Sequence, residues 1–396
     1  MNGWKEYKIL DAPFEIIDGD RGTNYPKQDE FSQNGYCLFL NAKNVTTDGF
    51  AFNECYFITK EKDKILRKGK LQRNDTILTT RGTVGNIGFF NERIPYENIR
   101  INSGMVIIRP DPKGILPEYT HQLFRYLKSD FDVFATGSAQ PQLPIRDLKE
   151  IIFLLPMLPE QRAIAGVLSS LDDKIDLLHR QNKTLEGMAE ALWRKMFVEE
   201  AESEWKVGKF GDFIKTTSGG TPLRNRQDYY ENGIYKWVKS KELQGTFIID
   251  TEEKITEEAL NCSSAKLLPG DSLLLAMYGA TVGEHGILTE EATCNQAICA
   301  LIPNENYPYT FIHMFLKMNK EEIINHAVGS AQQNISQVVI QNLEFIQPNN
   351  SIIQFHKMVE GYFEKIKLNI FQIRTLSRLR DMLLPKLMSG EVRVML

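Results

Sequence analysis

Two copies of the tetrapeptide Gly-Ser-Ala-Gln contain the side chains best suited to reading a nucleic acid. The first copy begins at Gly137 in GSAQPQL and the second at Gly329 in GSAQQNI. Glutamine and asparagine can form paired hydrogen bonds with an adenine edge, and serine can serve several bases. These segments therefore predict base contacts by Ser138, Gln140 and Gln142 in one copy and by Ser330, Gln332, Gln333 and Asn334 in the other. They are equally compatible with a turn followed by a helix cap, and the two interpretations do not exclude each other.

A glycine-rich turn also occurs twice, as RGTVG from Arg81 and as YGATVG from Tyr278. Its backbone amides and the hydroxyls of Thr83 and Thr281 would approach phosphates, with Arg81 or Tyr278 contacting DNA. A tight turn that needs glycine at positive φ explains the same pattern without a ligand, and the sequence favours that simpler explanation.

Three lysines follow an apolar run in one copy or the other and are candidate phosphate or base contacts: Lys43, Lys239 and Lys241. An ordinary solvated position explains any one of them. As a set they gain weight from their surroundings, because residues 205–245 hold eight Lys or Arg against four Asp or Glu, a local balance of +4.

These paired segments belong to a repeat that covers most of the chain. WKEYKILD at Trp4 matches WKVGKFGD at Trp205, and NGYCLFLNAKNV at Asn34 matches NGIYKWVKSKEL at Asn232. The order of the matching segments is kept throughout, while small insertions change their offset. Self-similarity of this kind predicts a tandem duplication.

Each copy is predicted to consist of a mixed domain followed by one long helix. Apolar runs bounded by Gly, Asn and Pro predict strands at 76–80, 105–108, 272–277 and 298–302, with helices at 117–128 and 309–325. Pro159 suits the first turn of the first long helix, and Asn349 to Ser351 offers an N-cap to the second. We therefore expect an α+β protein with mixed domains at 1–157 and 200–348 and long helices at 158–199 and 349–396.

Both long helices contain an apolar seam with unbroken 4-3 spacing, which is typical of a coiled coil. Each seam includes one asparagine, Asn182 in the first helix and Asn369 in the second. An antiparallel alignment that sets the two asparagines opposite each other pairs every other seam position, including the small Ala189 with the large Tyr362. We predict an intramolecular antiparallel coiled coil that relates the two copies by a pseudo-twofold axis. The alternative is that each helix packs on its own mixed domain.

Two further expectations concern the surface of these helices. Arg380 should face Leu171, with its aliphatic part on the seam and its charge in solvent. Met188, Trp193 and Phe197 are expected on exposed helix faces that form an interface with a partner.

The bulk properties exclude several classes of protein. The 396 residues are 42% hydrophobic and 25% charged, which is typical of a globular protein of two or three domains. The sequence contains neither a signal peptide nor an apolar run of about 18 residues. Five scattered cysteines without a CxxC pair indicate a reducing cytoplasm and predict no disulfide framework or zinc site. The net charge of −4 argues mildly against a nucleic-acid partner, although it conceals the basic stretch.

Catalytic motifs are not found. The glycines at 82, 85 and 88 lack the features of a dinucleotide or P-loop fingerprint, and Glu252-Glu253-Lys254 lacks a second metal-binding acid at a nuclease spacing. A duplicated active site should repeat its acids and bases, whereas the residues repeated here are Gly, Thr, Val, Ser, Ala and Gln. We expect a DNA-reading subunit without metal, cofactor or catalysis of its own. A protein-interaction scaffold that does not bind DNA is the alternative, and a nuclease with an unrecognised site is the weakest interpretation.

Two stretches resemble the conserved regions of type I restriction-modification specificity subunits. LPMLPEQRAIAGVLSSLDDKIDLLHRQNKTLEGMAEALWRKMF (155–197) resembles their central region, and MLLPKLMSGEVRV (382–394) resembles their C-terminal end. The resemblance covers essentially the whole chain and implies that 1–157 and 200–348 are target-recognition domains, each reading one half of a split target in double-stranded DNA.

The resemblance also implies partners. The helices would set the half-site spacing and dock two methyltransferase subunits, and translocase-nuclease subunits would join through that core. S-adenosylmethionine, ATP and Mg²⁺ would then be bound by the partner subunits. The second copy has Asn349-Asn350-Ser351-Ile352 in place of LPEQ, which predicts that the two docking surfaces differ.

Overall fold

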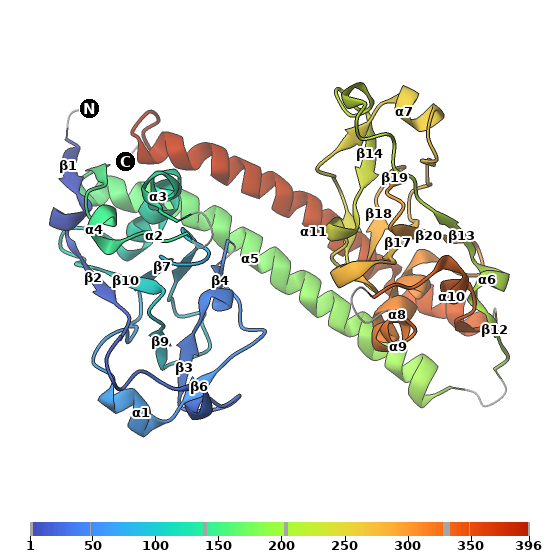
Figure 1. Ribbon diagram of the computed structural model, residues 1–396, viewed down its shortest axis with the longest axis horizontal. Helices are drawn as coiled ribbons and strands as arrows, with labels where there is room; N and C mark the ends of the chain where they lie inside the picture. The colour runs from blue at the N-terminus through green and yellow to red at the C-terminus, as the bar shows by residue number, and fades with distance from the viewer. Residues whose placement is uncertain are drawn as a thin grey trace. The chain divides into compact units, whose positions relative to one another are not determined.

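The computed structural model describes residues 3–47, 49–137, 141–201, 205–327, 333–347 and 349–394. The chain divides into two compact units, unit 1 with Met1–Lys174 and Leu376–Leu396, and unit 2 with Ile175–Thr375 (Figure 1). Each unit holds one copy of the repeat together with part of each long helix. The boundary between the two units therefore runs through both long helices. The sequence had instead suggested that each long helix is a segment separate from the mixed domains.

Unit 1 is built around a four-stranded antiparallel sheet in the order β2-β10-β7-β8 and a smaller sheet in the order β6-β3-β9. Its strands are β1 (Lys5–Lys8), β2 (Phe14–Asp18), β3 (Cys37–Leu40), β4 (Val45–Thr46), β5 (Gly49–Phe50), β6 (Phe57–Ile58), β7 (Thr76–Thr79), β8 (Ile87–Phe89), β9 (Ile99–Ile101), β10 (Met105–Pro110) and β11 (Ile152–Leu155). Its short helices are α1 (Lys60–Ile65), α2 (Pro117–Tyr126), α3 (Lys128–Phe134) and α4 (Ile145–Leu148).

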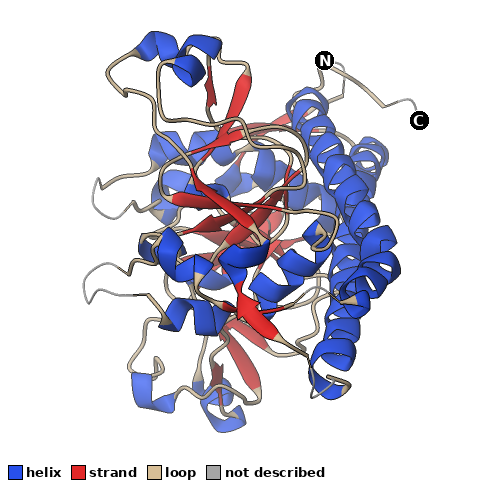
Figure 2. Ribbon diagram, turned by 90° about the vertical axis from the view of Figure 1, so that its right-hand side faces the viewer, coloured by secondary structure: helices blue, strands red, loops and turns tan. Residues whose placement is uncertain are grey.

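Unit 2 repeats this plan, with a sheet in the order β13-β20-β17-β18-β15 and a smaller one in the order β16-β14-β19. Its strands are β12 (Val207–Lys209), β13 (Lys215–Ser218), β14 (Tyr235–Val238), β15 (Phe247–Ile248), β16 (Lys254–Ile255), β17 (Leu273–Ala276), β18 (His285–Leu288), β19 (Thr293–Cys294), β20 (Ile298–Ile302) and β21 (Glu344–Ile346). Its short helices are α6 (Phe210–Phe213), α7 (Glu257–Asn261), α8 (Tyr309–Met318), α9 (Lys320–Asn325) and α10 (Gln337–Gln341). Figure 2 shows the mixture of helices and strands predicted from the sequence, and the shared strand order supports the duplication.

The register of the main sheets gathers three loops at one end of each unit. In unit 1 Asp18 lies opposite Val106, and Thr79 lies opposite Met105. The loops that follow β2 and β7 and the loop that precedes β10 therefore emerge side by side. We call residues 19–24, 80–86 and 102–104 the loop end of unit 1. The same pairings in unit 2, Ser218 with Cys299 and Ala276 with Ile298, define its loop end as residues 219–226, 277–284 and 295–297.

The two long helices are α5 (Leu158–Arg194), which ends in a π-helical turn, and α11 (Asn350–Met388). The expected N-cap of α11 is present, because Asn349 Oδ1 accepts hydrogen bonds from the backbone N–H groups of Ser351 at 3.0 Å and Ile352 at 3.2 Å. Among the helices of the described ranges, none is long and apolar enough to cross a membrane.

The predicted antiparallel register is present within each unit. In unit 2 Asn369 Nδ2 donates to Asn182 Oδ1 at 2.8 Å, and Tyr362 packs against the core cluster that contains the fully buried Ala189. In unit 1 the core cluster of Ile164 and Leu168 on α5 also contains residues of α11, namely Leu383, Leu387 and Met388. The helices also pack on the mixed domains, so the two alternatives drawn from the sequence are both part of the fold.

Several expectations were wrong in detail. The helix expected at 117–128 ends at Tyr126 and a new one begins at Lys128, and the helix expected at 309–325 is likewise interrupted at Asn319. At that second break the Asn319 side chain donates to the Phe315 carbonyl at 2.9 Å. Side-chain bonds of this type compete with the backbone pattern of a helix.

Arg380 does not extend its charge into solvent. Its guanidinium donates to Asp172 at 3.1 Å and to Asp381, and only 19% of the side chain is exposed. Burial by itself would lower the pKa of Arg380. The two carboxylates outweigh the effect of burial, so the pKa is raised. The sequence pattern missed this because Asp172 stands outside the apolar seam.

The expected partner face on α5 is only partly exposed. Met188 is 44% exposed, whereas Trp193 and Phe197 are buried in the core of unit 2. Trp193 packs on Phe311 with ring centroids 4.8 Å apart and on Phe355 at 5.5 Å. Aromatic contacts of this kind stabilise a core, so these two side chains hold the helix to the mixed domain.

Candidate nucleic-acid interface

The two candidate DNA-contacting segments meet in unit 1. The Gly82 N–H donates to the Pro141 carbonyl at 3.0 Å, and the Leu143 N–H donates to the Thr80 carbonyl at 2.8 Å. These bonds place Arg81 and Gln142 opposite each other as in an antiparallel sheet. Ser138 and Gln140 lie outside the described residues.

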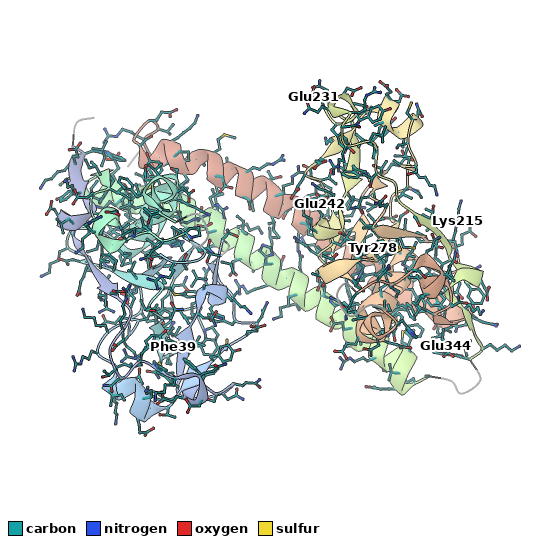
Figure 3. The ribbon with its side chains drawn as sticks, in the orientation of Figure 1. Phe39, Lys215, Glu231, Glu242, Tyr278 and Glu344 are labelled. Atoms are coloured by element: carbon teal, nitrogen blue, oxygen red, sulfur yellow. The ribbon has the colours of Figure 1, made fainter. Side chains whose placement is uncertain are left out.

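Unit 2 repeats this junction bond for bond. The Gly279 N–H donates to the Gln333 carbonyl at 2.9 Å, and the Ile335 N–H donates to the Met277 carbonyl at 2.9 Å, so Tyr278 faces Asn334. Tyr278, which is labelled in Figure 3, is 38% exposed, and Gln333 and Asn334 are also exposed. Ser330 and Gln332 lie outside the described residues.

The junction brings the glycine-rich turn and the amide segment to the same loop end in both copies. Within the described residues, the side chains of Arg81, Gln142, Tyr278 and Asn334 have no hydrogen-bonding or ionic partner. Equivalent positions thus present an arginine and a glutamine in unit 1 and a tyrosine and an asparagine in unit 2. A shared backbone with different polar side chains is the arrangement that two readers of different sequences require.

The glycines of the turn serve backbone geometry, as the simpler explanation predicted. Gly82 and Gly85 have φ of 82° and 86°, and Gly279 and Gly283 have φ of 71° and 81°. The hydroxyl of Thr281 donates to the Tyr278 carbonyl at 3.2 Å and so closes the turn. Thr83 is exposed, and its carbonyl accepts a hydrogen bond from the Thr79 hydroxyl.

The three candidate lysines differ in how firmly they are held. Lys43 and Lys241 are 76% and 61% exposed, with single ion pairs to Glu54 at 3.0 Å and Glu252 at 2.8 Å. Exposed pairs contribute little free energy, so these charges can turn to another anion. Lys239 is 14% exposed and is held by Glu252 at 2.7 Å and Glu253 at 2.9 Å. This double pairing makes Lys239 an internal cation of unit 2.

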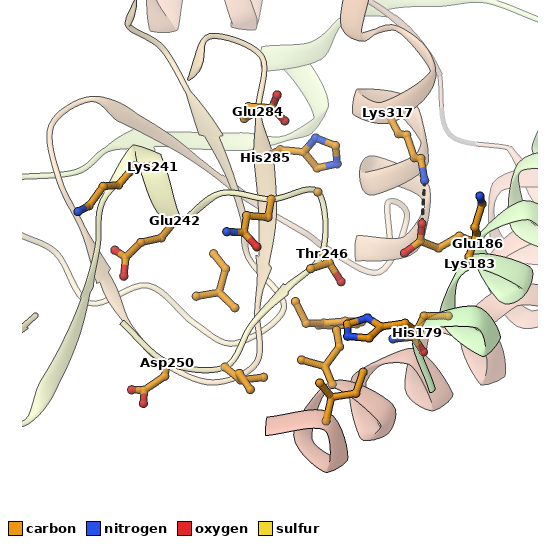
Figure 4. A pocket seen from close by; sticks show the side chains of 18 of the residues that line it. His179, Lys183, Glu186, Lys241, Glu242, Thr246, Asp250, Glu284, His285 and Lys317 are labelled. Atoms are coloured by element: carbon orange, nitrogen blue, oxygen red, sulfur yellow. Dashed lines mark hydrogen bonds and ion pairs between the residues drawn. The ribbon is translucent and has the colours of Figure 1, made fainter. Parts of the chain in front are cut away.

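A pocket of about 830 Å³ in unit 2 lies between the mixed domain and the long helices (Figure 4). Its lining contains five carboxylates and four lysines, and the lysines Lys317 and Lys320 are paired with Glu186 at 3.1 Å and Glu284 at 2.6 Å. Because carboxylates outnumber lysines in this lining, the pocket does not favour a phosphate ligand. The Lys317–Glu186 pair instead ties the mixed domain to α5, whereas the Lys320–Glu284 pair lies within the mixed domain.

Sequence patterns did not single out the loop at 19–24 or its neighbours Arg67 and Lys68. They line a pocket of about 470 Å³ at the loop end of unit 1. The only available signal was the repeat itself, since Asp18-Gly19-Asp20 occupies the place of Ser218-Gly219-Gly220 in the second copy.

The comparison with known proteins identifies the class. The family model of the type I restriction modification DNA specificity domain matches residues 1–187 and again residues 202–361. The chain therefore belongs to this family, and its function is to provide DNA target recognition to a type I restriction-modification system.

Individual relatives resemble the chain over nearly its full length. It is 29% identical over 384 residues to the MjaIX specificity subunit of Methanocaldococcus jannaschii, covering 88% of this chain and 86% of the relative. It is 23% identical to the HindI specificity subunit of Haemophilus influenzae, covering 99% of this chain and 100% of the relative. A crystal structure of the type I S subunit from M. genitalium shares the fold, with a TM-score of 0.62 at 16% identity over 98% of this chain and 96% of that one.

Proposed function

We propose that each unit reads one half of a bipartite target in double-stranded DNA, with its loop end as the reading surface. The observation that supports this most directly is the repeated junction, in which Arg81 and Gln142 are replaced by Tyr278 and Asn334 on the same backbone. Different side chains at equivalent positions would give the two halves different sequences. The long helices would set the spacing between the halves.

The chain itself would carry out no chemistry. Two methyltransferase subunits would dock on the long helices, and translocase-nuclease subunits would join through them, with S-adenosylmethionine, ATP and Mg²⁺ bound by these partners. The helices offer exposed apolar side chains for such contacts: Leu177, Met188, Met358, Leu368, Phe371, Leu379 and Met382. Apolar groups of this size on a helix surface are typical of an interface.

The test of DNA reading is a methylation map. The full chain is co-expressed with its candidate methyltransferase, and methylated adenines are mapped across the genome. We expect a split motif with two specified halves around a fixed gap. Gln142→Ala should relax one half only, and Asn334→Ala the other half only, because each removes an amide from one unit.

Gln72→Ala is the matched control, because Gln72 is exposed and precedes β7 at the opposite end of the sheet. The motif should not change in this variant. A complex that forms but methylates no defined motif would refute the proposal and favour a scaffold without DNA reading. Relaxation of both halves by either single variant would refute the assignment of one unit to each half.

Docking is tested separately by co-purification. Met358→Lys and Phe371→Lys each place a charge on an exposed apolar position of α11, where Met358 is 50% and Phe371 is 41% exposed. We expect loss of the co-purified methyltransferase with an unchanged melting temperature. Val133→Lys on α3, at an 80% exposed position, is the control and should leave the complex intact. Retention of the methyltransferase in both α11 variants would place its docking surface elsewhere.

A further inference from the structure

Two cations beside the loop end of unit 1 have no carboxylate partner among the described residues, whereas Arg21 within the loop end is paired with Asp18 at 3.2 Å. Arg67 and Lys68 are exposed beside the loop at 19–24, and neither side chain has an ionic partner in the part of the chain that the structure describes. The neighbouring Asp20 carboxylate is occupied by the backbone, since it accepts from the N–H groups of Gly22 at 2.8 Å and Arg67 at 2.7 Å. These bonds hold the loop in place and engage both carboxylate oxygens of Asp20 with backbone N–H groups.

Contacts connect this loop with the turn that holds Arg81. Arg21 donates to the Ser103 carbonyl at 3.3 Å, and the adjacent Gly104 carbonyl accepts from the N–H groups of Thr80 at 2.8 Å and Arg81 at 3.2 Å. The three loops lie at one end of three neighbouring strands, which are about 4.8 Å apart. The distance from the first strand to the third is thus about 10 Å, which corresponds to roughly three phosphates along one DNA strand.

A fourth cation stands beside the turn. A Cβ added at Gly85 would lie 3.5 Å from Cγ of Lys128, so the first residue of α3 covers this glycine. The Lys128 ammonium has no ionic partner among the described side chains. Arg67, Lys68, Arg81 and Lys128 therefore form one set, which we call the unit 1 cation set.

Unit 2 neutralises or replaces most of the equivalent charges. Lys320 takes the place of Lys128 beside Gly283, yet its ammonium is 2.6 Å from Glu284, where unit 1 has Asn86. Tyr278 takes the place of Arg81. The segment that corresponds to Arg67-Lys68 is Ser264-Ala265, which carries no charge, and the next residue, Lys266, donates to the Thr217 hydroxyl at 2.7 Å.

The two arginines in the loop end of unit 2 are also paired. Arg224 is 2.6 Å from Glu253 and lies over the Trp237 ring at 4.5 Å, and Arg226 is bound to Asp228 and to Glu258 at 3.0 Å. Their side chains are 51% and 45% exposed, but each is held by two neighbours, so they are less available to a phosphate than the unpaired cations of unit 1.

We propose that the two units bind DNA by unequal means: the unit 1 cation set binds backbone phosphates of its half-site, whereas unit 2 holds its half-site chiefly through uncharged contacts. The inference rests on the proposed DNA reading. It adds that most of the salt dependence of binding originates in one unit. It also names Arg67, Lys68 and Lys128, which lie outside the reading junction, as residues that supply affinity without sequence preference.

The experiment measures affinity for a duplex containing the mapped motif at several salt concentrations, using the full chain in complex with its methyltransferase. Each phosphate contact contributes about 0.9 to the slope of log K against log salt. The double variant Arg67→Ala/Lys68→Ala should reduce the slope by about 1.8. When the salt is raised from 50 to 200 mM, its affinity should then fall by a factor roughly twelve times smaller than that of the wild type. The methylated motif should stay the same, because phosphate contacts carry no direct sequence information.

Lys128→Ala and Glu284→Asn form a matched pair. Lys128→Ala should reduce the slope by about 0.9. Glu284→Asn copies the unit 1 residue and releases Lys320, so it should raise affinity at low salt and increase the slope by about 0.9. Melting temperatures verify that each variant folds.

The possible outcomes distinguish a failure of the proposed DNA reading from a failure of the unequal phosphate binding. If the wild-type complex shows no preference for any duplex, the proposed function itself fails. If it prefers its motif but folded Arg67→Ala/Lys68→Ala and Lys128→Ala variants keep the wild-type slope, the inference is overturned while DNA reading stands. A reduction by Lys266→Ala larger than that by Arg67→Ala/Lys68→Ala would assign the phosphate contacts to unit 2 and would also overturn it.

Discussion

The buried asparagine pair of unit 2 allows a sharp test of the helix register. Asn369 is fully buried, and its Nδ2 donates to Asn182 Oδ1 at 2.8 Å, with Gln181 at the outer limit of 3.5 Å. Asn369 Oδ1 accepts no hydrogen bond from the described residues. Asn182 is 9% exposed and so retains limited access to water. The two leucine substitutions are therefore expected to differ in cost.

The expected magnitudes follow from these contacts. Asn182→Leu leaves the Asn369 amide buried without its acceptor, which costs about 1–3 kcal/mol before any gain from the leucine. Asn369→Leu should cost less, because the Asn182 amide can turn toward water. In the double variant two apolar side chains meet, and each buried leucine contributes about 1.5–3 kcal/mol. The double variant should therefore be more stable, by about 2 kcal/mol, than the sum of the two single-variant effects predicts.

The assay is a double-mutant cycle on thermal unfolding of the full chain. For a folding unit of about 200 residues, a coupling of about 2 kcal/mol corresponds to about 4–8 °C in melting temperature. Lys183→Leu, at the exposed neighbouring position, replaces Asn182→Leu in a control cycle and should be additive with Asn369→Leu to within about 0.5 kcal/mol. Additivity in the Asn182 and Asn369 cycle would refute the conclusion that this hydrogen bond sets the register.

Three further predictions concern charged and titrating groups. Burial would raise the pKa of the Asp172 carboxyl, but its arginine and glutamine neighbours hold that pKa below the usual value. The ionised Asp172 therefore stabilises the fold fully above about pH 4, and this stabilisation is lost as the pH falls through the lowered pKa. Asp172→Asn should cost about 1–3 kcal/mol at neutral pH in urea unfolding, and an equal cost at pH 3 would contradict this. Burial lowers the pKa of His285 to about 4, so stability is full above about pH 6.5 and falls by up to about 3 kcal/mol toward pH 4. The substitution His285→Ile should reduce that decline, the rest of which comes from the neighbouring His313, whose pKa burial also lowers. A pH profile identical to that of the wild type would exclude His285 as a cause. Lys239→Ala should lower the melting temperature without changing the salt slope of DNA binding, whereas the reverse result would make Lys239 a phosphate ligand.

The sequence by itself determined the duplicated plan and the pairing of the long helices. The repeat fixes the order of elements in both units, and the spacing of apolar residues fixes the face that each helix buries. A single polar position in each seam, Asn182 and Asn369, was enough to choose the register, because only one antiparallel alignment pairs both asparagines and all apolar positions. These features are periodic or repeated along the chain, so they can be read without the tertiary structure.

Only the tertiary structure decided which polar side chains are available to a ligand. Lys239 looked like a phosphate contact until the fold brought Glu252 and Glu253 to it, and Lys128 and Lys320 look alike until Glu284 is seen beside the second. Whether a charge is neutralised depends on partners supplied by other strands and helices, which no local pattern records. The same reason explains why the turn at Arg81 and the segment at Gln142, far apart in the sequence, become one surface only in the folded sheet.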